Sequence, residues 1–218
     1  MKTARLWLMP LLFLGAVFLF LLAPGIDLAI SALFYSPQDG FSLKDTAWAK
    51  LFYVGSPLLV RAWIVILITA GLLSFWSRFR HLRRPALFLL AVISIGPGLA
   101  VTVLKDHWDR ARPVAIVQFG GDKQFTPAWV IADQCEDNCS FVSGHASGAF
   151  SLLALAWVFP RRRQFWLVAG TLWGAHMGLV RIAQGGHFLS DVIFAGFIVY
   201  FSADLLARWV FYRPPAPA

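Results

Sequence analysis

Long apolar runs alternate with short polar segments along most of the chain. The runs that carry few or no charges cover approximately residues 6–23, 57–76, 85–104, 140–160, 164–180 and 187–207. Each is close to the ~20 residues that an α-helix needs to cross the ~30 Å hydrocarbon core of a bilayer. Backbone polar groups in lipid must be satisfied within the segment, so helices are expected. The pattern predicts an all-α polytopic membrane protein, with six transmembrane helices in one bundle.

Composition supports this class and excludes a soluble globular domain. Of the 218 residues, 59% are hydrophobic and 14% are charged, whereas soluble domains carry about a quarter charged residues. We expect a single membrane domain over residues 1–212. The "RPPAPA" sequence at 213–218 cannot continue a helix and predicts a disordered tail.

The first apolar run follows Lys2 and Arg5, as the core of a signal peptide would. It is longer than the usual ~7–15 residues of such a core, and no small-residue cleavage site follows directly. We therefore expect a retained helix. The segment 24–56 that comes next is partly amphipathic, so a helix along the interface and an irregular loop are both compatible with it.

Positive charges gather at the start of the chain and in alternate connections between the runs. The net charge is +8, and the basic connections are "SRFRHLRR" at 77–84 and "RRR" at 161–163. Cytoplasmic loops are enriched in Lys and Arg. This predicts that both termini lie in the cytoplasm. We therefore attribute the net positive charge to the orientation of the protein in the membrane. No nucleic-acid partner is expected, because the sequence shows no basic patch on a soluble surface.

The segment 105–142 is the most polar part of the chain and falls on the outer side. It contains both cysteines, Cys135 and Cys139. An oxidising compartment favours a disulfide between them, which would brace the loop just before Ser143. Free thiols are the alternative, and zinc is disfavoured because a structural zinc site needs four ligands.

Three clusters of polar residues border the apolar runs, and the predicted topology places all of them at the extracytoplasmic edge. Charged groups near lipid are costly and usually functional. The clusters consist of Lys105, Arg110 and Arg112, then Ser143, Gly144 and His145, then Arg181, His187 and Asp191.

Spacing within the first cluster predicts that two cations point the same way. Lys105 and Arg112 are seven residues apart, so on a helix they share a face about 10 Å apart. Pro113 disfavours helical geometry at Arg112, so the helix should end there. Asp106, Asp109 and Arg110 could form local ion pairs or contact a substrate headgroup, and the sequence does not choose between these roles.

The other two clusters predict a nucleophile and an anion-binding helix end. Asp191 lies four residues after His187, where its carboxylate can accept the Nδ1 proton and leave Nε2 free to attack. Ser143 can cap a helix with His145 in its first turn, and a helix N-terminus binds anions.

Cations that converge on one point repel each other unless an anion joins them, and a phosphoryl group meets that demand. We therefore expect His187 to attack phosphorus while Asp191 holds its ring, and His145 to protonate the leaving oxygen and then activate water. No cofactor or metal is expected, because cations supply the charge that Mg²⁺ supplies elsewhere. The expected phosphate ligands are Lys105, Arg112, Arg181 and the amides near Ser143 and Gly144.

The segments "KDHWDRARP", "SGH" and "RIAQGGHFLSD" resemble the three-part signature of the type-2 phosphatidic acid phosphatase and vanadium haloperoxidase superfamily. That signature reads Lys, six residues, Arg-Pro; then Pro-Ser-Gly-His; then Ser-Arg, five residues, His, three residues, Asp. The resemblance spans roughly residues 60–205 and implies a six-helix layout and a phosphohistidine intermediate. Val142 and Val180 replace the usual proline and serine, which loosens a turn and removes a hydroxyl.

Together with this resemblance, these observations predict a lipid phosphatase of the bacterial inner membrane that hydrolyses a phosphate monoester or pyrophosphate of a lipid at the periplasmic face. The segment "NCSFVSGHAS" is similar to the one in bacterial lipid A phosphatases, which makes the lipid A class the preferred substrate. Alternatives are an undecaprenyl-diphosphate or phosphatidylglycerol-phosphate phosphatase, a lipid-to-lipid phosphotransferase and a non-enzymatic lipid transporter. A transporter would often show inverted repeats and helices broken at the midplane. The expected partners are the lipid phosphate and the membrane, and the oligomeric state stays open.

Overall fold

Helices make up most of the computed structural model, which describes residues 2–211; the predicted tail at 213–218 lies outside the described residues. Within that range there is no strand longer than an isolated bridge. The α-helices are α1 (Lys2–Leu22), α2 (Gly25–Ala32), α3 (Ala47–Leu73), α4 (Arg83–Ile93), α5 (Val101–Trp108), α6 (Gly144–Phe150), α7 (Leu155–Val158), α8 (Arg163–Ala183) and α9 (Leu189–Phe211). Shorter helical pieces are η1 (Ser42–Asp45), η2 (Ser77–Leu82), the π-helical η3 (Ser94–Ala100), η4 (Pro113–Ala115), η5 (Val117–Phe119), η6 (Ser151–Ala154) and η7 (Pro160–Arg162).

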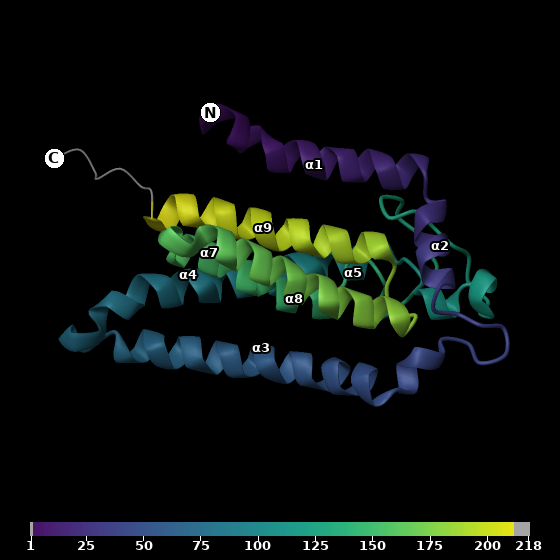
Figure 1. Ribbon diagram of the computed structural model, residues 1–218, viewed down its shortest axis with the longest axis horizontal. Helices are drawn as coiled ribbons and strands as arrows, with labels where there is room; N and C mark the ends of the chain where they lie inside the picture. The colour runs from purple at the N-terminus through teal and green to yellow at the C-terminus, as the bar shows by residue number, and fades with distance from the viewer. Residues whose placement is uncertain (1, 212–218) are drawn as a thin grey trace.

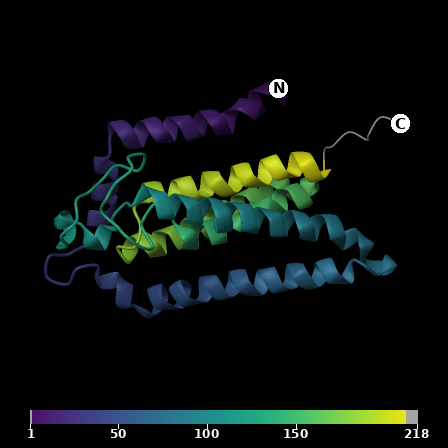
Figure 2. The ribbon, with the colours of Figure 1, turned by 180° about the vertical axis from the view of Figure 1, so that it is seen from behind.

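The long helices run side by side along the longest axis of the molecule (Figure 1). α1 lies along the outside of α9, where Phe13 packs edge-on against Phe194, Phe197 and Phe201. α2 turns away from α1 by 83° and crosses the end of the bundle. The irregular segment after α5 and the α8–α9 connection lie at that same end, while η2 and η7 lie at the other end (Figure 2).

Membrane character is clear from helix length and hydropathy. Among the described residues, three segments are long and apolar enough to cross a membrane: Ala47–Leu73, Ser77–Ala115 and Leu189–Phe211. The bent pair of α1 and α2 makes a fourth if it counts as one span. The helical stretch Gly144–Val158 is apolar but shorter. The expectation of an all-helical integral membrane protein is confirmed, and the count of six spans stays a prediction.

Two helix boundaries differ from those predicted. The second span begins ten residues early, at Ala47, because the Thr46 side chain caps it by accepting a hydrogen bond from the Ala49 amide. The segment 24–56, which by sequence is compatible with a helix or an irregular loop, is therefore partly helical. The fourth run is helical only from Gly144, although the residues before it are fully buried. An apolar sequence indicates that a segment is buried but not that it is helical. The buried residues just before Gly144 were therefore wrongly included in the predicted helix.

Glycines on α8 allow close contact with the segment from α6 to η6. A Cβ atom at Gly174 would lie 2.1 Å from the Phe150 ring, and one at Gly170 would lie 2.6 Å from the backbone nitrogen of Leu153. A backbone atom cannot rotate away as a side chain can, so the two helical segments could not approach this closely with a larger residue at 170.

Replacing Gly170 with alanine is expected to destabilise the protein by about 1–3 kcal/mol, because overpacking forces the backbone of η6 to move. Thermal unfolding in detergent measures this. Gly15→Ala on α1 is the matched control: a Cβ there meets nothing within 4 Å, so the better helix propensity of alanine should leave stability equal or higher. Equal melting temperatures for both variants would contradict the close contact.

Candidate active site

Six of the eight predicted site residues line a small pocket at the end of the bundle where α2 crosses it. The pocket has a volume of about 90 Å³, which is room for about three water molecules and suits a phosphoryl group. Ser143 and Asp191 do not line it but are fully buried. The lining residues are Tyr53, Lys105, Arg112, Asn138, Gly144, His145, Arg181 and His187.

Lys105 and Arg112 reach the pocket by a different route from the one predicted. α5 ends at Trp108, and Asp109 adopts a left-handed conformation with φ of 45°. The expectation of one helix carrying both cations to Arg112 is therefore wrong. Carbonyl groups of the following loop hold them instead: Lys105 Nζ donates to Cys139 O, and Arg112 donates to Asn138 O from Nε and Nη2 at 3.0 and 2.6 Å.

The carbonyls that hold these two cations belong to a cross-linked loop. Cys135 and Cys139 are joined by a disulfide bond in the structure. Between them, Asn138 adopts a left-handed conformation with φ of 48°, which asparagine tolerates better than most residues. The short ring thus presents two successive carbonyl oxygens, those of Asn138 and Cys139, toward Arg112 and Lys105.

Arg181 enters the pocket from the last turn of α8. Its Nη1 donates to Gln184 Oε1 at 2.5 Å, and its guanidinium carbon lies 4.8 Å from the centre of the Tyr53 ring. Gly186 leaves space for it, since a Cβ there would lie 2.2 Å from Nη2. Arg181 Nε is buried and has no hydrogen-bond partner among the described residues. A buried donor without a partner is costly, so an acceptor from a ligand would fit here.

His145 lies in the first turn of α6 and packs against α3. Ser143 caps that helix by accepting a hydrogen bond from the Ala146 amide at 3.4 Å, as predicted. The Tyr53 ring stacks on the imidazole at 4.9 Å between centroids, with 15° between the planes. Pro57 has no N–H to occupy the Tyr53 carbonyl four residues before it, and the Tyr53 backbone hydrogen-bonds the His145 ring. Tyr53 was not found from the sequence.

His187 lies in the connection just before α9, where a backbone carbonyl holds its ring. Nδ1 is 2.8 Å from Ser140 O and 3.6 Å from Asp191 Oδ2. The predicted direct hydrogen bond from Nδ1 to Asp191 is therefore replaced by one to a carbonyl, with the carboxylate beside it. Burial lowers the pKa of the His187 imidazole to about 3, against the effect of Asp191. The ring is then neutral at pH 7, with Nε2 as its free nitrogen.

Asp191 has other partners that fix its position. Its Oδ2 accepts from Ser140 Oγ at 2.5 Å and from the Phe188 amide at 2.8 Å, while Arg110 Nη1 donates to Oδ1 at 2.6 Å. Because Ser140 also supplies the carbonyl for His187, the carboxylate and the imidazole are positioned by the same residue.

Arg110 is completely buried and is the centre of this polar cluster. Its Nη1 also donates to Ser190 Oγ at 2.9 Å, its Nε donates to Thr126 O at 2.9 Å, and its Nη2 donates to Asp27 Oδ2 at 2.8 Å. The structure thus decides the open question about Arg110: it forms ion pairs, but with partners far away in the sequence. It does not line the pocket.

Asp27 connects α2 to the active-site end of α9. Besides Arg110, it accepts from the Ser190 amide at 2.9 Å and from Ser190 Oγ at 2.5 Å. Sequence reasoning missed this residue. The available signal was an acid inside the apolar stretch "GIDLAI", because a carboxylate in such a place needs a buried partner.

The charged side chains that converge on the pocket are cations, so its chemistry suits an anion. Within residues 2–211, no group of three or more His, Cys, Asp or Glu side chains is arranged to hold a metal ion. Two imidazoles with different surroundings accompany the cations: His187 is enclosed, and His145 is stacked on a half-exposed tyrosine. This arrangement can bind a phosphoryl group and transfer it.

Comparison with known proteins agrees with this chemistry. Residues 85–215 match the PAP2 superfamily. A lipid A 4'-phosphatase of Francisella tularensis subsp. novicida (strain U112) is 42% identical over 205 residues, covering 88% of this chain and 87% of that protein. Lipid A 4'-phosphatases of Rhizobium leguminosarum and Rhizobium etli are 33% and 34% identical, each over 78% of this chain, and over 81% and 73% of their own lengths. No solved structure matches the chain significantly.

The chain belongs to the PAP2 superfamily, as its motifs implied. Within that superfamily it is a membrane lipid phosphatase, a hydrolase of phosphoric monoesters, and this prediction is confirmed by the relatives above. All eight predicted site residues fall inside the matched range, whereas Asp27 and Tyr53 precede it.

Replacing Arg110 with methionine is expected to lower the free energy of unfolding by about 3–5 kcal/mol, because two buried carboxylates lose their cation. Phosphatase activity should fall with it, since Asp191 loses a partner that fixes its position. Unfolding in detergent and initial rates measure the two effects.

The matched control for Arg110→Met is Arg208→Met. Arg208 pairs with Asp204 at 2.6 Å on the outside of α9, and exposed pairs contribute only about 0–1 kcal/mol. If both variants unfolded at the same temperature and kept the wild-type rate, the central role of Arg110 would be disproved.

Proposed function

We propose that this protein removes a phosphate group from lipid A at the outer face of the bacterial inner membrane, through a phosphohistidine on His187. The observation that carries the proposal is the convergence of three cations, from separate segments, on one small pocket that also contains two imidazoles. The substrate preference is supported by the relatives, which are lipid A 4'-phosphatases.

The first chemical step forms a bond between His187 Nε2 and phosphorus and breaks the bond from phosphorus to the sugar oxygen. His145 donates its proton to that departing oxygen. Lys105, Arg112 and Arg181 hold the equatorial oxygens and stabilise the charge that develops on them. The Ser140 carbonyl and the Asp191 carboxylate stabilise the positive charge that the phosphorylated imidazole acquires.

The second step returns the enzyme to its starting state. A water molecule gives a proton to His145 and attacks phosphorus, the bond from phosphorus to Nε2 breaks, and inorganic phosphate leaves. The same three cations stabilise the phosphoryl oxygens in both steps, so no additional cation has to bind before the second step. We expect no metal requirement for the same reason.

The proposed orientation is supported by the basic residues at one end of the bundle. The start of α1, the basic connections η2 and η7 and the end of α9 lie at one end, and the α8–α9 connection lies at the other (Figure 2). That connection carries His187, which lines the pocket. We therefore place the first end in the cytoplasm and the pocket at the periplasmic edge. In this arrangement α1, α3, α4–α5, α6–α7, α8 and α9 are the six spans.

The proposed substrate can be tested with purified protein and three labelled lipids: lipid A, undecaprenyl diphosphate and phosphatidylglycerol phosphate. We expect phosphate release to be fastest from lipid A and unchanged in excess EDTA, because the cations that bind phosphate are side chains. Phosphate that appears on a second lipid would indicate a phosphotransferase. Lipid flux without hydrolysis would indicate a transporter, and loss of activity in EDTA would contradict the metal-independent mechanism.

The roles of the two histidines can be separated by trapping the intermediate with ³²P-labelled substrate. His145→Ala should lower kcat about 10²–10⁴-fold and, with a good leaving group, should accumulate acid-labile label on the protein, because attack no longer needs a proton donor. His187→Ala should bind substrate but show neither label nor turnover. Label on the His187→Ala protein would assign the nucleophile to another residue.

A further inference from the structure

Arg61 is a cation near the middle of a membrane-spanning helix. It lies 14 residues after the start of α3 and 12 before its end, and the segment Ala47–Leu73 is one of the candidate spans. Its side chain is exposed. Among the residues that the structure describes, it has no ion pair, hydrogen bond or aromatic ring as a partner. A charge in such a place is costly and usually functional.

Arg61 borders a groove between α3 and the π-helical segment η3. The groove has a volume of about 440 Å³, within the ~300–1,000 Å³ that is usual for ligand pockets. Besides Arg61, its wall includes Ile64 from α3 and Ser94 and Pro97 from η3. Its walls are mostly apolar, as a lipid chain requires.

The groove adjoins the catalytic pocket. Gly144 and His145 line both of them. Arg61 follows Tyr53 by eight residues, so it lies about 12 Å deeper along α3. Side chains on a helix tilt toward its N-terminus, and the N-terminal end of α3 is the end that carries Tyr53. Arg61 is therefore placed to reach a group that lies in the groove between itself and the bound phosphate.

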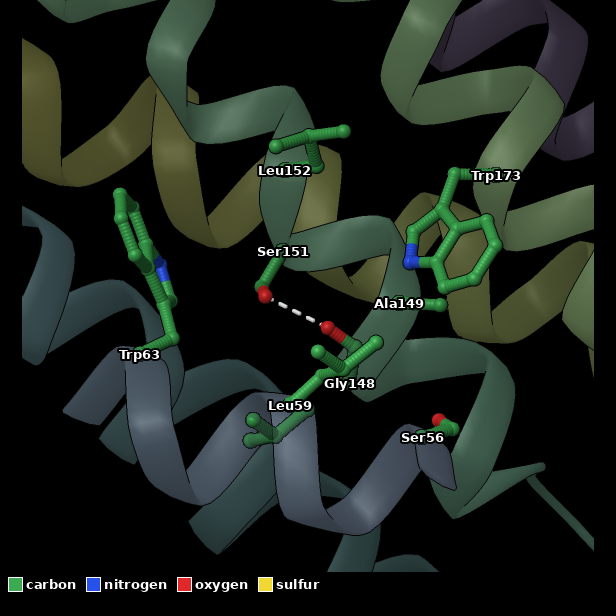
Figure 3. A pocket seen from close by; sticks show the side chains of 9 residues that line it. Ser56, Leu59, Trp63, Gly148, Ala149, Ser151, Leu152 and Trp173 are labelled. Atoms are coloured by element: carbon green, nitrogen blue, oxygen red, sulfur yellow. Dashed lines mark hydrogen bonds between the residues drawn. The ribbon is translucent and has the colours of Figure 1, made fainter. Parts of the chain in front are cut away.

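A second groove that shares residues with the first shows what Arg61 adds. A Cβ at Gly148 would lie 3.1 Å from Val60, and both residues line both grooves. The second groove, of about 200 Å³, is bordered by Trp63 from α3 and Trp173 from α8 and has no charged residue in its wall (Figure 3). The second groove therefore suits the hydrocarbon part of a lipid chain. The groove that contains Arg61 can also donate a hydrogen bond to an oxygen atom of the ligand.

On the basis of the function proposed above, we propose that Arg61 binds the oxygen atoms of the substrate's acyl chains, their ester or amide carbonyls or chain hydroxyls, in the groove between α3 and η3. Arg61 thereby makes the enzyme prefer phosphorylated acyl lipids to phosphorylated polyprenols. A polyprenyl chain has no such oxygen, so it would leave the guanidinium without a partner. Arg61 is thus a residue that determines specificity and takes no part in the phosphoryl transfer.

The test compares the wild-type protein with Arg61→Leu in detergent without phospholipid, using lipid A and a polyprenyl phosphate as substrates. For lipid A, kcat/KM should fall about 10- to 100-fold, the range expected for loss of a hydrogen bond from a charged donor. For the polyprenyl phosphate it should stay within about twofold or rise. Arg61→Lys should recover part of the loss, because it keeps a donor.

Arg78→Leu is the matched control, since it removes the same charge from η2, at the opposite end of the bundle from the pocket. It should leave both substrates unaffected. Equal losses on both substrates, or no loss on lipid A, would overturn the role of Arg61 while the phosphatase stands. An effect that appears only after phospholipid is added would also overturn it, because Arg61 would then pair with bulk lipid. If the wild-type protein hydrolysed neither substrate, the proposed function itself would fail, and this inference with it.

Discussion

The active-site end of the molecule depends on one buried guanidinium. Arg110 joins Asp27 on α2, the loop at Thr126 and Asp191 on α9, and its own carbonyl accepts from the Ser140 amide at 2.8 Å. Buried ion pairs add little net stability, because removing charges from water is costly. Such a pair instead specifies how the segments are arranged. Once the two carboxylates are buried, they need the cation between them, and this requirement fixes how the separate segments meet.

The charges around His187 are unequal on its two sides, and this asymmetry suits its chemistry. On the Nδ1 side of the ring, the Ser140 carbonyl contacts Nδ1, and the carboxylates of Asp27 and Asp191 both pair with Arg110. On the other side of the ring, the pocket is lined by cations. The proton on Nδ1 therefore faces acceptors, while Nε2 faces the place where a phosphoryl anion would bind. In the proposed mechanism, the same field that fixes the tautomer would also attract an anionic substrate toward the free nitrogen.

Local patterns in the sequence predicted the apolar helices and six of the eight residues that line the pocket, because hydropathy and motif spacing are local properties. They could not predict where α5 ends. Trp108 and Asp109 offer their carbonyls to the amides of Ala132 and Gln134 at 3.0 Å, so the loop that folds back completes the helix end. Asp27 was missed for a related reason, since its partner Arg110 is 83 residues away.

In the proposed mode of substrate binding, α3 contributes to recognition at two depths. Tyr53 contacts both His145 and Arg181 at the pocket, and Arg61 borders the groove below it. The two residues lie on one helix, so the geometry of α3 sets the distance from the phosphate site to the deeper cation. A ligand with its anionic group and its first chain oxygens at a matching separation satisfies both places at once. One helix can therefore measure the substrate from its headgroup into its chains, which a pocket built only from loops at the membrane edge could not do.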